Sequence, residues 1–100
     1  MNATRRRAIK ELRRMVLDAL GDRDAEVWLF GSCARDEVMQ HSDIDIGILP
    51  HEPLPPAFLA NLDADIEESS VPYDVDVVDL SRARQQFVDA VRREGIVWRK

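Results

Sequence analysis

The chain has 100 residues, 45% hydrophobic and 33% charged, which is the composition of one small globular domain spanning residues 1–100. No apolar run approaches the roughly 18 residues that span a bilayer, no secretory signal is visible, and a single cysteine excludes an internal disulfide, so a cytoplasmic protein is expected. The net charge of −5 is uneven: the first twenty and the last twenty residues each carry +4 and residues 21–80 carry −13, which argues against direct nucleic-acid binding and suits a site that collects cations.

A helix and a buried strand are the first two predicted elements. Residues 4–20 are predicted to form an amphipathic helix, because their apolar side chains recur at helical spacing while basic residues, Arg5 among them, cover the other faces. Gly21 is expected to end this helix. Residues 26–30 form a short apolar run typical of a buried strand, and this strand ends at Gly31-Ser32.

The middle of the chain is predicted to hold a short helix, a strand and a longer helix. Residues 33–39 can form the short helix. Residues 43–49 alternate carboxylates with isoleucines, which is the period-two pattern of a strand. Four prolines between residues 50 and 56 indicate a stiff loop. Residues 56–69 then favour a helix that turns Leu62 and the other apolar side chains inward.

The last part of the chain is predicted to add a strand and a helix. Residues 73–80 form the strand, and Ser81 is expected to cap a helix that stops before Gly95. This helix is expected to bury Phe87, Val88 and Val91. The apolar tail at residues 96–98 fits a short strand or a docking segment. The order of elements predicts an α+β fold, a small mixed sheet of three or four strands flanked by helices.

Two of these elements carry residues suited to phosphate and metal chemistry. Gly31 permits a sharp turn where a strand meets a helix, and Ser32 adds a hydroxyl, so together they suit a phosphate group. Asp43 and Asp45 point to the same face of their strand. Their mutual repulsion would be relieved by a hard divalent cation such as Mg²⁺, which prefers carboxylate oxygens. On an exposed strand the same pair would be simple surface charge.

A third carboxylate on the strand 73–80 would complete a site for two metal ions. Asp74 and Asp76 share one face of this strand, and Asp79 lies on the other. Two metal ions held by such carboxylates clamp the entering and leaving oxygens of a phosphoryl displacement.

The motifs together resemble the DNA polymerase β nucleotidyltransferase superfamily, and within it the minimal nucleotidyltransferases that pair with a HEPN-type partner. The resemblance rests on Gly31-Ser32, on Asp43-Ile44-Asp45 ten residues later, and on the strand Val75-Asp76-Val77. It implies that Gly31 and Ser32 hold the β- and γ-phosphates of ATP or another nucleoside triphosphate. It further implies that Asp43, Asp45 and Asp76 ligate two Mg²⁺ ions, and that Asp76 helps to activate an acceptor hydroxyl.

One position departs from the family pattern. Such proteins commonly read Gly-Ser-x-Ala-Arg-Gly, and here Asp36 replaces the last glycine. Asp36 suggests that the short helix continues, and it adds negative charge near the triphosphate. Arg35 could contact phosphate or could instead pair with Asp36 or Glu37.

The expected function is therefore a Mg²⁺-dependent nucleotidyltransferase. The resemblance implies transfer of AMP from ATP to a hydroxyl on a HEPN-type partner protein, as the antitoxin of a toxin–antitoxin pair, in a homo- or hetero-oligomer. The alternative is a binding module that neutralises or scaffolds its partner by contact, using the tail at residues 95–100 and the helix faces. A weaker alternative is RNA binding by the Arg-rich first helix.

Overall fold

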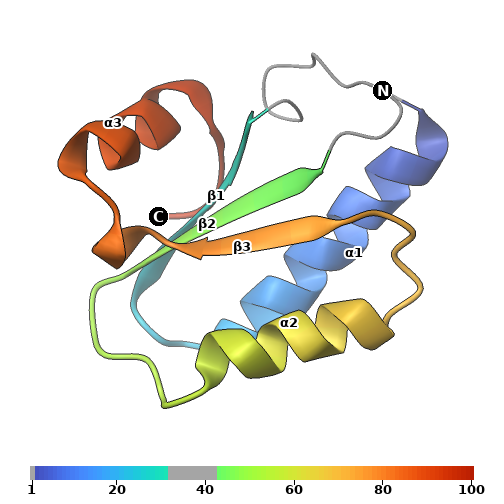
Figure 1. Ribbon diagram of the computed structural model, residues 1–100, viewed down its shortest axis with the longest axis horizontal. Helices are drawn as coiled ribbons and strands as arrows, with labels where there is room; N and C mark the ends of the chain where they lie inside the picture. The colour runs from blue at the N-terminus through green and yellow to red at the C-terminus, as the bar shows by residue number, and fades with distance from the viewer. Residues whose placement is uncertain (1, 32–42) are drawn as a thin grey trace.

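The computed structural model describes residues 2–31 and 43–100, and its centre is a four-stranded mixed sheet in the order β3-β2-β1-β4 (Figure 1). The strands are β1 (Ala25–Phe30), β2 (Ile44–Pro50), β3 (Val75–Asp79) and β4 (Ile96–Arg99). β1 pairs antiparallel with both β2 and β4, and β2 pairs parallel with β3. This confirms the predicted α+β fold with a small mixed sheet, and the apolar tail forms the fourth strand.

Helices cover both faces of the sheet. α1 (Ala3–Leu20) and α2 (Phe58–Glu68) lie on one face, and α3 (Gln85–Glu94) lies on the other (Figure 1). The larger cluster of buried side chains joins α1 and α2 to the alternate residues of the strands, which include Val27, Ile44 and Ile46. The smaller cluster joins Val88 and Val91 of α3 to Trp28 and Leu80. The two faces of each strand therefore have different neighbours.

The sequence of α1 explains its ends and its buried stripe. The Asn2 side chain accepts a hydrogen bond of 2.7 Å from the Arg5 backbone N–H and so caps the first turn. The helix ends at Gly21, whose φ is +60° and whose N–H donates to the Leu17 carbonyl. Leu12 lies in the buried stripe, as predicted.

Arg5 was predicted on a solvated face of this helix, and that prediction is wrong. Its side chain is 1% exposed, and its guanidinium lies 4.3 Å from the centroid of the Tyr73 ring. A planar cation is attracted to the negative face of an aromatic ring, and its stem can pack as an apolar group. Arg5 therefore ties α1 to the segment that enters β3.

The crossover through α2 is what makes β2 and β3 parallel. Two parallel strands cannot be joined by a tight hairpin, and here α2 makes the return across one face of the sheet (Figure 1). Leu62 and Ile66 are its buried residues, as the helical spacing predicted. The crossover brings β3 to the edge of the sheet beside β2, with the starts of the two strands at the same end.

The predicted cap at Ser81 is wrong. The Asp79 carboxylate accepts hydrogen bonds from the Ser81 backbone N–H at 3.0 Å and from its hydroxyl at 2.6 Å. This arrangement fixes a short 3₁₀ turn, η2 (Leu80–Arg82), and delays α3 until Gln85. The burial of Val88 and Val91 is confirmed, but Phe87 is 42% exposed, because it begins a face of α3 that the sheet does not cover.

Among the described residues, no helix has both the length and the apolar character to cross a membrane.

Candidate active site

The two acid motifs meet at the starts of β2 and β3. In the parallel register, Asp45 lies directly beside Asp76, and neighbouring strands are about 4.8 Å apart. Ile44 and Ile46 are fully buried on the face covered by α1 and α2, so Asp45 between them lies on the opposite face. Asp43 directly precedes β2. The structure thus brings the predicted acids of two separate segments to one end of the sheet.

The electrostatics of Asp45 follow from this arrangement. Burial raises the pKa of the Asp45 carboxyl, and the negative charges of Asp76 and Asp43 raise it further. Within residues 2–31 and 43–100, neither Asp45 nor Asp76 has a salt bridge or a side-chain hydrogen bond. Burial and neighbouring negative charge thus make the ionised form of Asp45 unfavourable, and a bound cation would relieve this cost.

Gly31 closes this site from the side of β1. Phe30, the last residue of β1, is the antiparallel partner of Asp45, and Gly31 follows it with φ of +73°. A Cβ at Gly31 would lie 3.2 Å from the Asp45 Cγ and would collide with its Oδ2. Only glycine combines this backbone conformation with such close approach. The position predicted for phosphate binding thus directly contacts a predicted metal ligand.

The other predicted phosphate-binding residues, Ser32 and Arg35, lie outside the described residues, as do the short helix at 33–39 and Asp36.

One further acid near the site, Asp63, was not predicted from the sequence. Asp63 lies on α2, and its pKa is raised first by burial, then by the charge of Asp76 and then by that of Glu67. Its neighbour Leu62 belongs to the apolar stripe that identified the helix, but nothing in the local sequence indicates that this turn approaches the edge strand. Asp63 adds to the negative potential around Asp76.

The chemistry of these donors fits Mg²⁺, which favours carboxylate oxygens. In the part of the chain that the structure describes, however, no three His, Cys, Asp or Glu side chains are gathered around one point as ligands of a metal ion. Asp45 and Asp76 supply neighbouring carboxylates on one face, with Asp43 close in sequence. The type of these donors therefore fits a hard cation, although the described side chains do not form a complete coordination shell.

An open hollow of about 710 Å³ lies at the other end of the parallel pair. Residues 50–60 line it together with Asp79, Ser81 and Arg82. Asp79 ends β3, whereas Asp76 lies near its start, so none of the predicted site residues lines this hollow.

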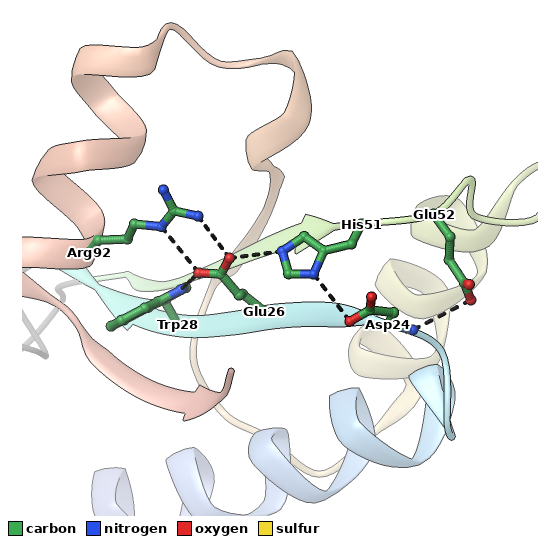
Figure 2. A network of polar contacts seen from close by, with 6 residues as sticks. All are labelled: Asp24, Glu26, Trp28, His51, Glu52 and Arg92. Atoms are coloured by element: carbon green, nitrogen blue, oxygen red, sulfur yellow. Dashed lines mark hydrogen bonds and ion pairs between the residues drawn. The ribbon is translucent and has the colours of Figure 1, made fainter.

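A second polar cluster, the Glu26 network, surrounds Glu26 on the same face of the sheet (Figure 2). The Arg92 guanidinium donates two hydrogen bonds to the Glu26 carboxylate, at 2.8 and 3.2 Å, and the Trp28 indole N–H donates a third at 3.1 Å. The His51 Nε2 lies 2.8 Å from the Glu26 Oε2, and its Nδ1 lies 3.1 Å from Asp24. The pKa of Glu26 falls to about 2, mainly because of the Arg92 hydrogen bonds.

His51, which directly follows β2, is also a member of this network. Both of its ring nitrogens face carboxylates, and only the protonated imidazolium donates from both. Its hydrogen bonds to Glu26 and then to Asp24 raise its pKa.

The four-stranded mixed sheet with helices on both faces is the fold of a nucleotidyltransferase. The chain belongs to the polymerase beta nucleotidyltransferase family, which it matches over residues 24–98.

Within this family, the chain is similar to small nucleotidyltransferases and to a toxin–antitoxin. It is 34% identical over 76 residues to the Haemophilus influenzae protein named "Probable protein adenylyltransferase MntA". The aligned region covers 74% of this chain and 65% of that relative. The chain thus spans just under two thirds of the length of this curated relative. A structure assigned as a minimal nucleotidyltransferase has a TM-score of 0.71 at 27% identity and covers 90% of this chain and 92% of that one. The crystal structure of a toxin–antitoxin with AMP-PNP has a TM-score of 0.67 at 27% identity, covering 86% and 71%.

Proposed function

We propose that the chain is a Mg²⁺-dependent nucleotidyltransferase that moves AMP from ATP onto a hydroxyl group of a partner protein. The observation that carries this proposal is the register that places Asp45 between Phe30 and Asp76, with Gly31 against the Asp45 carboxylate. Family membership supports the reaction class, and the related toxin–antitoxin with AMP-PNP supports a nucleoside triphosphate as substrate.

Each residue has a role in this reaction. Asp43, Asp45 and Asp76 would hold two Mg²⁺ ions, which would neutralise charge on the triphosphate and on the leaving group. Gly31 and Ser32 bind the β- and γ-phosphates, and Arg35 lies close enough in sequence to contact them. Asp76 orients the acceptor hydroxyl and takes its proton. The acceptor oxygen then bonds to the α-phosphorus, the bond to the bridging oxygen breaks, and pyrophosphate leaves with the electron pair.

The proposed acceptor is a HEPN-type toxin, for which this chain is the antitoxin. The resemblance in the acid and Gly-Ser motifs supports this partner, as does the likeness to a solved toxin–antitoxin. AMP attached to a toxin hydroxyl would add bulk and negative charge at that position, which is a direct way to block a site.

The test is transfer of label from α-³²P-ATP to the partner. The native chain with Mg²⁺ is expected to label the partner, and Asp43→Asn and Asp76→Asn are expected to lower the rate at least about a hundredfold, as loss of a charge-stabilising group does. Asp65→Asn on α2 is the matched control, because it removes one exposed carboxylate outside the site. Equal labelling by the Asp76 variant and the control would contradict the proposal.

A second candidate function is neutralisation of the partner by contact alone. The exposed Ile96 and Val97 of β4 favour it, since they leave apolar surface open to a partner. If this is the function, the Asp43→Asn and Asp76→Asn variants inhibit the toxin as strongly as the native chain does. The Val97→Asp variant no longer inhibits it. Truncation of the tail is a poor test, because it would also remove Trp98 from the main core and so destabilise the fold.

A further inference from the structure

Phe87 is an exposed aromatic side chain that the folding of this chain does not explain. It lies in the first turn of α3 and remains 42% exposed, while Val88 and Val91 on the same helix are buried. Its ring packs edge to face against Phe30, with 5.6 Å between centroids and an angle of 86° between planes. The contact with Phe30 leaves a large part of Phe87 accessible to solvent.

Phe30 connects this exposed ring to the acid site. It is the antiparallel partner of Asp45 and precedes Gly31, so its Cα lies about 5 Å from that of Asp45. Phe30 also packs on the face of the sheet that α3 covers, which is the face of Asp45 and Asp76. The order Asp76, Asp45, Phe30, Phe87 therefore runs across one face, from the carboxylates to an open aromatic ring.

We propose that Phe87 binds the base of the nucleoside triphosphate by stacking, a role that rests on the proposed function of the site. A nucleotide carries its negative charge at one end and an aromatic ring at the other. The cation-collecting acids and the Gly31 turn suit the phosphates, and the Phe87 ring suits the base. Phe30 packs against the Phe87 ring at nearly a right angle and so helps to fix its position. Stacking on phenylalanine accepts any base, so this contact supplies affinity and leaves base choice to other groups.

The test compares binding of two ligands, ATP and inorganic tripolyphosphate, each with Mg²⁺, by titration calorimetry on the whole chain. Phe87→Ala is expected to weaken ATP binding about tenfold, the loss typical of one base–aromatic stack. Binding of tripolyphosphate, which has no base, is expected to stay unchanged, and Phe87→Trp is expected to restore ATP binding. Ile96→Ala is the matched control, because Ile96 is 47% exposed and pairs with Leu29, whose side chain belongs to the other face.

The outcomes separate this role from the proposed function. Unchanged ATP affinity in Phe87→Ala overturns the stacking role, whether or not the variant still binds the partner protein, and leaves the nucleotidyltransferase intact if Asp76→Asn loses transfer. An equal loss for ATP and tripolyphosphate also overturns it, because the ring would then act on the phosphate site. If the native chain binds neither ligand and transfers no label, the proposed function fails and the stacking role fails with it.

Discussion

Glu26 and Asp45 lie on the same face of adjacent strands, and the fold treats them in opposite ways. Glu26 accepts hydrogen bonds from Arg92 and Trp28 and faces His51, and its pKa falls to about 2 (Figure 2). Asp45 lies beside Asp76, and burial together with like charge raises its pKa. Between Glu26 and Phe30, the partner of Asp45, there are four steps along β1, about 13 Å.

This difference distinguishes an acid that the chain itself neutralises, Glu26, from the acids of the candidate site. Glu26 is neutralised by groups that the chain itself supplies, so it contributes to stability. Asp45 and Asp76 lack such groups among the described residues, so their negative charge is available to a ligand. Four predictions test this contrast.

The largest expected effect on stability comes from Glu26→Ala. The substitution leaves Arg92, Trp28 and His51 without their shared acceptor, and hydrogen bonds to a charged group contribute about 1.5–3 kcal/mol. We expect the free energy of unfolding, measured by urea denaturation, to fall by about 2–3 kcal/mol. Glu52→Gln is the control, since Glu52 makes one exposed contact of 3.4 Å with the Asp24 N–H. Equal losses in the two variants would show that the Glu26 network is not structural.

Gly31→Ala is expected to lower stability and to abolish transfer. The backbone at φ of +73° costs a side chain about 1–2 kcal/mol, and the new Cβ displaces the Asp45 carboxylate. Gly21→Ala provides a matched comparison, because Gly21 also has positive φ but a Cβ at that position would meet no atom within 4 Å. Both variants should lose stability in thermal unfolding, and only Gly31→Ala should lose labelling of the partner. Full activity in Gly31→Ala would refute the contact with Asp45.

Asp45→Asn is expected to raise stability slightly while transfer is lost. The folded chain holds the pKa of Asp45 above its usual value of 3.8, so folding disfavours the ionised form. The stability linked to this group is present below that value and is lost as the pH rises through the higher folded pKa. At pH 7 the neutral amide removes the repulsion, and we expect a gain of up to about 1 kcal/mol in urea. A loss of stability comparable to that in Glu26→Ala would erase the contrast between the two acids.

The smallest expected effect is the response of the Glu26 network to pH. Hydrogen bonds to Glu26 and Asp24 raise the pKa of His51 above 6.5. The stability that this group contributes is therefore present below pH 6.5 and is lost as the pH rises through the folded pKa. Thermal unfolding between about pH 6 and pH 9 should show a decline in Tm that His51→Gln lacks. The same decline in both proteins would assign it to other groups.

The sequence predicted most of the elements, and the shared position of the candidate site acids, because those features are periodic. The alternation around Asp45 and Asp76 indicated both the strands and the shared face. What it could not indicate depends on contacts between distant segments. Arg5 meets Tyr73, and Glu26 meets His51 and Arg92, across separations that no local pattern encodes.

The predictions for Ser81 and Phe87 failed for two other reasons. At Ser81 a neighbouring side chain provides the cap, and at Phe87 the sheet leaves one side of the helix exposed. Ser81 does not cap α3, because the Asp79 carboxylate two residues earlier accepts a hydrogen bond from the Ser81 N–H and caps the 3₁₀ turn instead. Phe87 was predicted to be buried together with Val88 and Val91, but the sheet covers only one side of α3. The roles of Ser32 and Arg35 stay predictions, since both lie outside the described residues.

The positions of the acids also disfavour any other register between β2 and β3. A slip of β3 by one residue would place a valine beside Asp45 and turn Asp76 toward the layer of Ile44 and Ile46. Burying a carboxylate without a partner in this apolar layer costs free energy, so the shifted register is less stable than the observed one. The buried apolar layer therefore favours the register that places Asp45 beside Asp76. The sheet of the Mg²⁺-free chain should accordingly assemble unaided, ready for its ligands.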